Sequence, residues 1–369
     1  MKPISTLALS FTFIGSFLGA GYISGQELFQ FFGAFGFSGV IGLFFAIAIL
    51  ALFNLMIIKI VHKNNNAEID RTVVGADKKG LLFSVGVLES VIFFGTFVVM
   101  AAGFGALVEK LCGNGLSYYI GSFLFCLVIA FLAIKGITGL VKIFSFAVPV
   151  LVVITVFVGI TALNKYGANG FDLTPSAKFN PLIPNWIAGA VTFASYNLFC
   201  AIGVLCPVGL RVKSGKSAVL GTVLGGIFLI LVAAAVLVSL AVYPSAKAEE
   251  LPMMAVAQSI SPALSYVYAF LMFLAMTGAS LASIIPIVSY LADHSRACEM
   301  HGAVTTFVLC FLAFLLSCFG FADLVGTLFS SFGYISLLGL LGLTLHYFKV
   351  RKKLNRRKKC GVQTVAKPY

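Results

Sequence analysis

Long apolar stretches recur along almost the whole chain and are separated by short polar connections. Each is close to or above the about 20 residues that a helix needs to cross a bilayer core. The pattern predicts ten membrane-spanning helices in an all-α protein. They cover 5–32, 36–61, 81–110, 118–134, 140–163, 185–208, 216–242, 262–292, 302–319 and 325–349. We therefore expect one transmembrane domain over 5–349 and a tail at 350–369.

The ten stretches form two sets of five with matching spacing. A shift of about 180 residues carries the first five onto the second five, and the polar connection at 62–80 recurs at 243–261. Because each set has an odd number of crossings, the second copy enters the membrane from the opposite side. This predicts two inverted repeats, 5–163 and 185–349. In transporters such repeats place the solute near the midplane, where a helix of each repeat is broken.

The first stretch contains "IGSFLGAGYISGQELFQFF", which holds small and polar residues where a membrane helix should be most regular. Gly19, Gly21 and Gly25 each lower helix propensity by about 1 kcal/mol relative to Ala. We predict a break over 19–26 and a second break at the corresponding positions 194–203.

Two other interpretations of the same residues remain open. The pairs Gly15/Gly19 and Gly21/Gly25 are GxxxG motifs, which often serve close helix packing. Ser24 and Glu27 have the spacing of a capping box, in which Glu27 would reach back to the backbone of Ser24. A capping box there would itself require a helix to restart at Ser24.

Composition and charge agree with a membrane protein. The chain is 60% hydrophobic and only 10% charged, unlike an ordinary soluble domain. The net charge of +13 does not indicate nucleic acid, because all but four of the 25 Lys and Arg residues fall on one side of the predicted spans. The four exceptions are Lys110, Lys165, Lys178 and Lys247. The positive-inside rule then predicts a multi-pass protein of the cell membrane with both termini cytoplasmic.

The start of the tail, "KVRKKLNRRKKC", is strongly basic. We expect it to contact anionic lipid headgroups, with a tail that binds another protein as the alternative.

The sequence shows no enzyme site. His62, His294, His301 and His346 lie in cytoplasmic loops or at a span end, without a Ser-His-Asp set, a phosphate loop or metal-ligand spacing. We expect no cofactor and no resident metal, and only H⁺ or Na⁺ as a candidate coupling ion.

With these spans, the repeat and the "GAGYISGQE" motif, the sequence resembles the YkvI-type membrane proteins. This group is regarded as amino-acid permeases of the amino acid, polyamine and organocation superfamily, which has the fold of the leucine transporter LeuT. The resemblance implies a secondary transporter of a small amino acid, amine or related organic solute that works by alternating access. A channel or a membrane-embedded sensor without turnover is the alternative.

The resemblance also implies site residues. The segment from Gly19 to Gly25 would line the substrate site, together with a residue of the third span and three of the sixth. The full set is Gly19, Ala20, Gly21, Tyr22, Ile23, Ser24, Gly25, Thr96, Ser195, Tyr196 and Asn197.

A sodium site of this fold would use the carbonyls of Gly15 and Leu18 and an adjacent Ser/Thr pair on the eighth span. Alignment on Pro286 places Gly278 and Ala279 where that pair belongs. The flanking hydroxyl residues, Thr277 and Ser280, are the remaining candidates, so the sequence departs from the sodium-coupled pattern.

Two acidic residues lie within predicted spans, where an ionised group costs several kcal/mol. Glu89, in the third span, is a candidate for proton coupling or for attracting a cation, with a structural carboxylate as the alternative. Glu27 lies just beyond the first predicted break and is a second candidate, with the capping role as its alternative.

Overall fold

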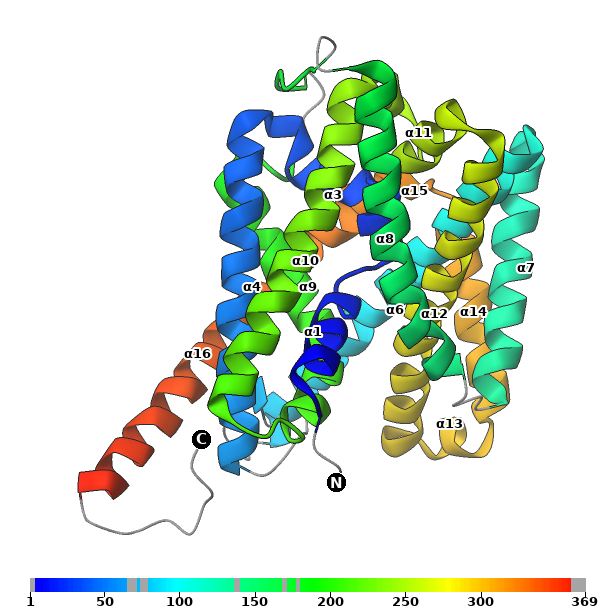
Figure 1. The fold of residues 1–369 in the computed structure, drawn as a ribbon. Coiled ribbons are helices and arrows are strands. Elements are labelled where there is room, and N and C mark those ends of the chain that lie inside the picture. The colour runs from blue at the N-terminus through cyan, green and yellow to red at the C-terminus, as the bar shows by residue number, and fades with distance from the viewer. Residues whose placement is uncertain are drawn as a thin grey trace.

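The computed structural model describes residues 4–64, 72–73, 79–135, 140–167, 171–176 and 180–359. These residues form a bundle of helices (Figure 1), and their only β contact is an isolated bridge between Ile4 and Val212. The bundle has two ends. The lower face is the end where the first helix begins and the last one finishes, and the upper face is opposite.

Eight helices of the described chain are long and apolar enough to cross a membrane. They are α4 (Phe37–Asn64), α6 (Lys79–Cys112), α7 (Gly115–Ile134), α8 (Leu140–Tyr166), α9 (Trp186–Gly209), α10 (Gly215–Val242), α12 (Pro262–His294) and the run that ends in α16 (Ser330–Lys359). Two shorter apolar helices are α1 (Thr6–Gly15) and α14 (Gly302–Ser317). Each of the ten overlaps one predicted stretch, and most of them extend beyond its bounds.

The remaining elements are short and connect or interrupt the long helices. They are α2 (Ala20–Ser24), α3 (Gln26–Phe31), η1 (Gly33–Phe35), η3 (Pro244–Ala248), α11 (Pro252–Ile260), α13 (Arg296–Met300), α15 (Phe321–Leu324) and the π-helical turn η4 (Val325–Phe329).

The outward surfaces of the long helices are apolar, as contact with lipid requires. Large apolar side chains on α4, α7, α12 and α16 are about half exposed or more, and examples are Phe44, Phe45, Leu52, Phe131, Phe270 and Leu338. In water such a continuous apolar exterior would aggregate. The exterior therefore agrees with a bilayer environment.

The packing crosses between the two sequence halves. Helix α4 packs along α9, and α10 packs along α1, while α6 packs on both α7 and α12. The pairs α4–α9 and α10–α1 each join the second helix of one predicted repeat to the first helix of the other. Two inverted repeats would produce this exchange of partners.

The first span is interrupted at mid-height (Figure 1). Helix α1 ends at Gly15, and α2 begins only at Ala20, with Gly19 as an extended N-cap residue. A second interruption follows at Gly25, whose φ of 84° separates α2 from α3. A side chain at Gly25 would be strained and would place a Cβ 3.1 Å from Met253 Cγ, so glycine suits this turn. The first interruption begins three residues before the predicted 19–26 segment, and the second lies within it.

The predicted break in the sixth span is wrong. Helix α9 runs without interruption from Trp186 to Gly209, through the whole 194–203 segment. Two of its polar residues lie against carbonyls of their own helix. Asn197 Nδ2 donates to the Phe193 carbonyl at 3.1 Å, and Ser195 Oγ lies 3.1 Å from the Thr192 carbonyl and also contacts the Gly333 carbonyl of α16. Polar side chains that bond back in this way are compatible with continuous helix.

The loop 243–261 closes the upper face over the interrupted span. It contains η3 and the buried helix α11, which packs against α2, α10 and α12. Three contacts hold it: Lys110 Nζ lies 2.8 Å from Glu249 Oε2, Lys247 Nζ lies 2.9 Å from Asp172 Oδ2, and the Ala322 N–H donates to Glu250 Oε2 at 2.8 Å. We call this segment the upper loop.

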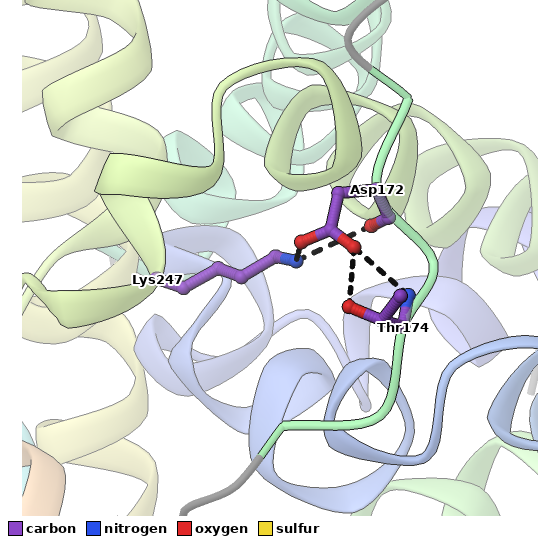
Figure 2. Close-up of polar contacts among 3 residues, drawn as sticks. All are labelled: Asp172, Thr174 and Lys247. Atoms are coloured by element: carbon purple, nitrogen blue, oxygen red, sulfur yellow. Dashed lines mark hydrogen bonds and ion pairs between the residues drawn. The ribbon is translucent and has the colours of Figure 1, made fainter.

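Figure 2 shows the Asp172 contact in detail. Asp172 accepts hydrogen bonds from the Thr174 hydroxyl and N–H and also pairs with Lys247. These hydrogen bonds from Thr174 and Lys247 hold the pKa of the Asp172 carboxyl well below its usual range. The contact is favourable while Asp172 is ionised and is lost only as the pH falls through that lowered pKa.

Candidate functional site

A buried carboxylate faces α9 just after the interruption of the first span. Glu27 is 3% exposed, and its Oε1 accepts hydrogen bonds from the Tyr196 hydroxyl and, at 3.1 Å, from Asn197 Nδ2. The second oxygen, Oε2, has no hydrogen bond to any described residue. The structure thus brings together three residues that the sequence analysis had placed in the site on separate grounds.

Gly21 makes room for this carboxylate. A Cβ at Gly21 would lie 2.6 Å from Glu27 Oε2 and 3.2 Å from Glu27 Cβ. Real Cβ atoms essentially never make contacts below 3.0 Å, so any side chain at position 21 would displace Glu27. The functional reason for glycine here is the close approach of the carboxylate to the α2 backbone.

Aromatic rings pack beside Tyr196, the hydrogen-bond partner of the carboxylate. The Tyr196 ring stacks on Phe329 with centroids 4.9 Å apart, and Phe31 meets Phe193 edge to face at 5.7 Å. Phe329 belongs to the π-helical turn η4, and such turns are frequent at functional sites. The sequence analysis missed Phe31, Phe193 and Phe329, because an aromatic residue within an apolar span carries no signal that separates a site from ordinary packing.

Several of the predicted substrate residues instead fix α2 in place. The Tyr22 hydroxyl donates to the Leu229 carbonyl of α10 at 2.8 Å, and the Ile23 carbonyl accepts from the Tyr268 hydroxyl of α12 at 2.7 Å. Ser24 Oγ donates to the Gly21 carbonyl at 3.0 Å. These contacts position the backbone of the interruption.

The capping-box interpretation of Glu27 does not agree with the geometry. The N-cap of α3 is Gly25, and Ser24 Oγ accepts from the N–H of Gln26 at 3.2 Å. Glu27 points to α9 and does not reach back to Ser24. Its carboxylate is therefore directed at the tertiary structure.

The interruption itself borders open space. A Cβ at Gly19 would meet no atom within 4 Å, although Phe17 and Leu18 on its N-terminal side are buried. The N–H groups of Leu18 and Gly19 bond to the carbonyls of Ile14 and Phe17. The carbonyl of Gly15 therefore lies outside the regular helical ladder.

The sodium-site candidates give a mixed result. Thr277 Oγ1 donates to the Phe273 carbonyl of its own helix at 2.8 Å. Ser280 is fully buried, and its hydroxyl has no hydrogen-bond partner among the described residues. The described contacts do not bring either hydroxyl to Gly15 or Leu18, so a sodium site stays a prediction.

Glu89 and Thr96 lie on α6, on the lower side of the Glu27 cluster. Glu89 is 8% exposed, and Thr96 Oγ1 donates to the Ile92 carbonyl at 2.9 Å and lies 3.8 Å from Cys200 Sγ. Cys200 is one helical turn below Tyr196 on α9. Thr96 therefore lies near the cluster, and a role for Glu89 in coupling stays a prediction.

Comparison with known proteins agrees with this architecture. No protein-family model matches the chain. It is 27% identical over 276 residues to the uncharacterized membrane protein YkvI of Bacillus subtilis (strain 168), covering 73% of this chain and 76% of YkvI. It is also 28% identical over 214 residues to the uncharacterized protein YyaD of the same organism, covering 58% of this chain and 60% of YyaD.

Solved structures with a similar fold are membrane transporters. MhsT in complex with L-phenylalanine superposes with a TM-score of 0.62 at 16% identity, covering 94% of this chain and 89% of MhsT. Mhp1, a nucleobase-cation-symport-1 family transporter, gives a TM-score of 0.60 at 13% identity over 89% of this chain and 74% of its own. A Na⁺-coupled sialic acid symporter gives 0.57 at 16% identity over 94% of this chain and 78% of its own. The chain is therefore a membrane protein with the LeuT fold, homologous to YkvI.

Proposed function

We propose that the protein is a secondary transporter of a small amino acid, amine or related organic solute, and that it works by alternating access around the interruption of the first span. The observation that carries this proposal is the buried Glu27–Tyr196–Asn197 cluster beside a helix break that borders open space. In transporters with inverted repeats, broken helices line the solute site near the midplane.

The proposed architecture has ten crossings in two inverted repeats, with α1 to α3 together forming the first. The exchange of packing partners between α4–α9 and α10–α1 supports this arrangement. The positive-inside distribution supports a cytoplasmic lower face, so the upper loop would face the outside of the cell. In this orientation the described state is closed to the outside.

The side chains in the site indicate the chemical class of the solute. One carboxylate, one phenol and one amide lie among aromatic rings, which suits a compact solute with an amino group and an apolar part. Two of the similar structures, those of MhsT and Mhp1, have L-phenylalanine and bromovinylhydantoin bound, which are of comparable size.

A transport experiment tests the proposal against the channel and sensor alternatives. Purified protein in vesicles loaded with an unlabelled amine or amino acid should take up the labelled solute in exchange, and uptake should saturate. A channel gives no such counterflow, because it does not bind one solute per conformational cycle. Non-saturating leakage of every solute tested, or no flux at all, would refute a carrier.

The upper loop should open more readily when one of its two ion pairs, the partly exposed Lys247–Asp172 pair, is removed. Met253 is a fully buried residue of this loop, in α11, so a Met253→Cys probe in a background without accessible cysteines reports its opening. Lys247→Ala should raise the rate of labelling by a membrane-impermeant maleimide about 2- to 5-fold, which corresponds to about 0.5–1 kcal/mol for a partly exposed pair. Lys59→Ala, on the lower face, is the matched control. An unchanged rate in Lys247→Ala would show that this pair does not hold the loop.

A further inference from the structure

The electrostatic surroundings of Glu27 restrict what can bind there, and this inference rests on the proposed transport function. Lys and Arg are absent from the elements that form and border the Glu27 cluster, namely α1, α2, α3, η1, η4 and α9. The ion pairs found in the described residues lie at the upper face and do not involve Glu27. The carboxylate is thus 3% exposed without a protein cation beside it.

The titratable groups around Glu27 are all acids. The elements packed on α3 are α2, α9, α10, η1 and η4. From these, Tyr22, Tyr196 and Cys200 lie toward the carboxylate, and Glu89 lies beyond Cys200 on α6. Lys216 is in the first turn of α10, at the lower end of that helix and far from the Glu27 cluster. None of the nearby groups can become positive and neutralise Glu27.

An isolated ionised carboxylate in such a place costs several kcal/mol, even with hydrogen bonds to it. Glu27 must therefore carry a proton or pair with a cation that enters and leaves. Oε1 is occupied by Tyr196 and Asn197, and Oε2 is the oxygen without a bond to a described residue. A proton and a mobile cation would compete for Oε2.

The Phe329 ring near Oε2 favours an organic cation. The position of the missing Gly21 Cβ lies 2.6 Å from Glu27 Oε2 and 3.5 Å from Phe329 Cε2, so an aromatic ring borders the same space as the free oxygen. Aromatic faces attract ammonium groups by cation–π interaction, an interaction worth about 2 kcal/mol when desolvated. A solute carboxylate would find no Lys or Arg on these elements.

We propose that the transported solute is a compact organic cation, an amine in its ammonium form or a quaternary ammonium, whose charge pairs with Glu27, and that this cation and a proton occupy Glu27 in turn. On one face of the membrane the protonated carboxyl binds the cation and releases its proton to that side. On the other face a proton replaces the cation. One solute charge is exchanged for one proton in each cycle.

The test uses quaternary cations, choline and phenyltrimethylammonium, because they cannot carry a proton or cross the bilayer as neutral bases. L-Phenylalanine is the zwitterionic comparison. Binding to the purified protein is followed by calorimetry and by the rise in melting temperature. Proton movement in vesicles is followed with a dye sealed inside. We expect one proton released per cation bound, and an affinity that falls about tenfold for each unit of pH below the ionisation of Glu27.

Glu27→Gln should abolish cation binding and proton release while the protein stays folded, because the Gln carbonyl can still accept from Tyr196 and Asn197. Glu27→Asp should weaken binding but keep its pH dependence. Glu299→Gln, an acid at the lower face on α13, is the control and should behave as the parent protein.

Two results would overturn the inference in distinguishable ways. If L-phenylalanine exchanges saturably and independently of pH, in the parent and in Glu27→Gln, the cation-for-proton exchange is wrong but the protein is still a transporter. If no probe or solute shows saturable exchange, the proposed function fails as well.

Discussion

Gly21→Leu is expected to abolish solute binding and transport. The Leu side chain would occupy the position now taken by the Glu27 carboxylate, since even a Cβ there would lie 2.6 Å from Glu27 Oε2. It would also fill the space that borders Phe329. Displacement of the carboxylate is expected to disturb its hydrogen bonds with Tyr196 and Asn197.

Gly21→Ala provides a graded version of the same change. Its single methyl group would displace Glu27 Oε2 and is expected to weaken at least one hydrogen bond to the carboxylate. Hydrogen bonds to charged groups contribute about 1.5–3 kcal/mol, so uptake should fall roughly 10- to 100-fold. Initial uptake rates in vesicles, normalised to the amount of folded protein, measure this loss.

The control for both variants is Gly80→Ala. Gly80 is also a helical glycine, in α6, and a Cβ there would meet no atom within 4 Å. It should transport as the parent protein does. Normal uptake by Gly21→Leu would remove α2 from the solute site and would contradict the proposed position of Glu27.

The second large effect concerns folding. Gly39, near the start of α4, approaches the backbone of the preceding span so closely that a Cβ would lie 1.8 Å from the Phe32 carbonyl oxygen and 2.6 Å from the Phe32 carbonyl carbon. Backbone atoms cannot rotate away as a flexible side chain can. Gly39→Ala should therefore force α3 and α4 apart, at a cost of about 3 kcal/mol or more.

Yield of monodisperse protein and the melting temperature in detergent measure this effect. Gly302→Ala, at the start of α14, has no atom within 4 Å of the added methyl group and is the matched control. If Gly39→Ala melts within one or two degrees of Gly302→Ala, the close packing of α3 on α4 would be wrong.

The interruption of the first span was predictable because its cause is local. Gly19 is the N-cap of α2, and Gly25 forms the left-handed turn between α2 and α3. Such preferences depend only on the residue itself and its neighbours in sequence. The long apolar spans were predictable for the same reason, since length and hydropathy are local properties.

The backbone conformation of α9 could not be predicted from local sequence. Ser195 and Asn197 are equally suited to a broken helix and to a continuous one, because their side chains can bond to carbonyls of their own helix. The match to the first repeat favoured a break, but the sixth span has no glycine at its centre to promote one. Symmetry of spacing did not imply symmetry of backbone conformation.

The partners of Glu27 were beyond sequence reasoning for a different reason. Tyr196 lies 169 residues away along the chain, and only the packing of α3 on α9 brings the two together. The local Ser24–Glu27 pattern suggested a capping role instead. Gly25 shifts the start of α3 and turns Glu27 outward from its own backbone.

The uninterrupted course of α9 has a consequence for how preference for cargo can change during evolution. A site built from main-chain atoms on both sides is difficult to alter by single substitutions, since every amino acid offers the same amide. Here one wall of the proposed site consists of neighbouring side chains on the uninterrupted helix α9. Substitution of Tyr196 or Asn197 would change the shape of that wall while α9 stays intact. Related transporters could therefore differ in solute preference by single substitutions.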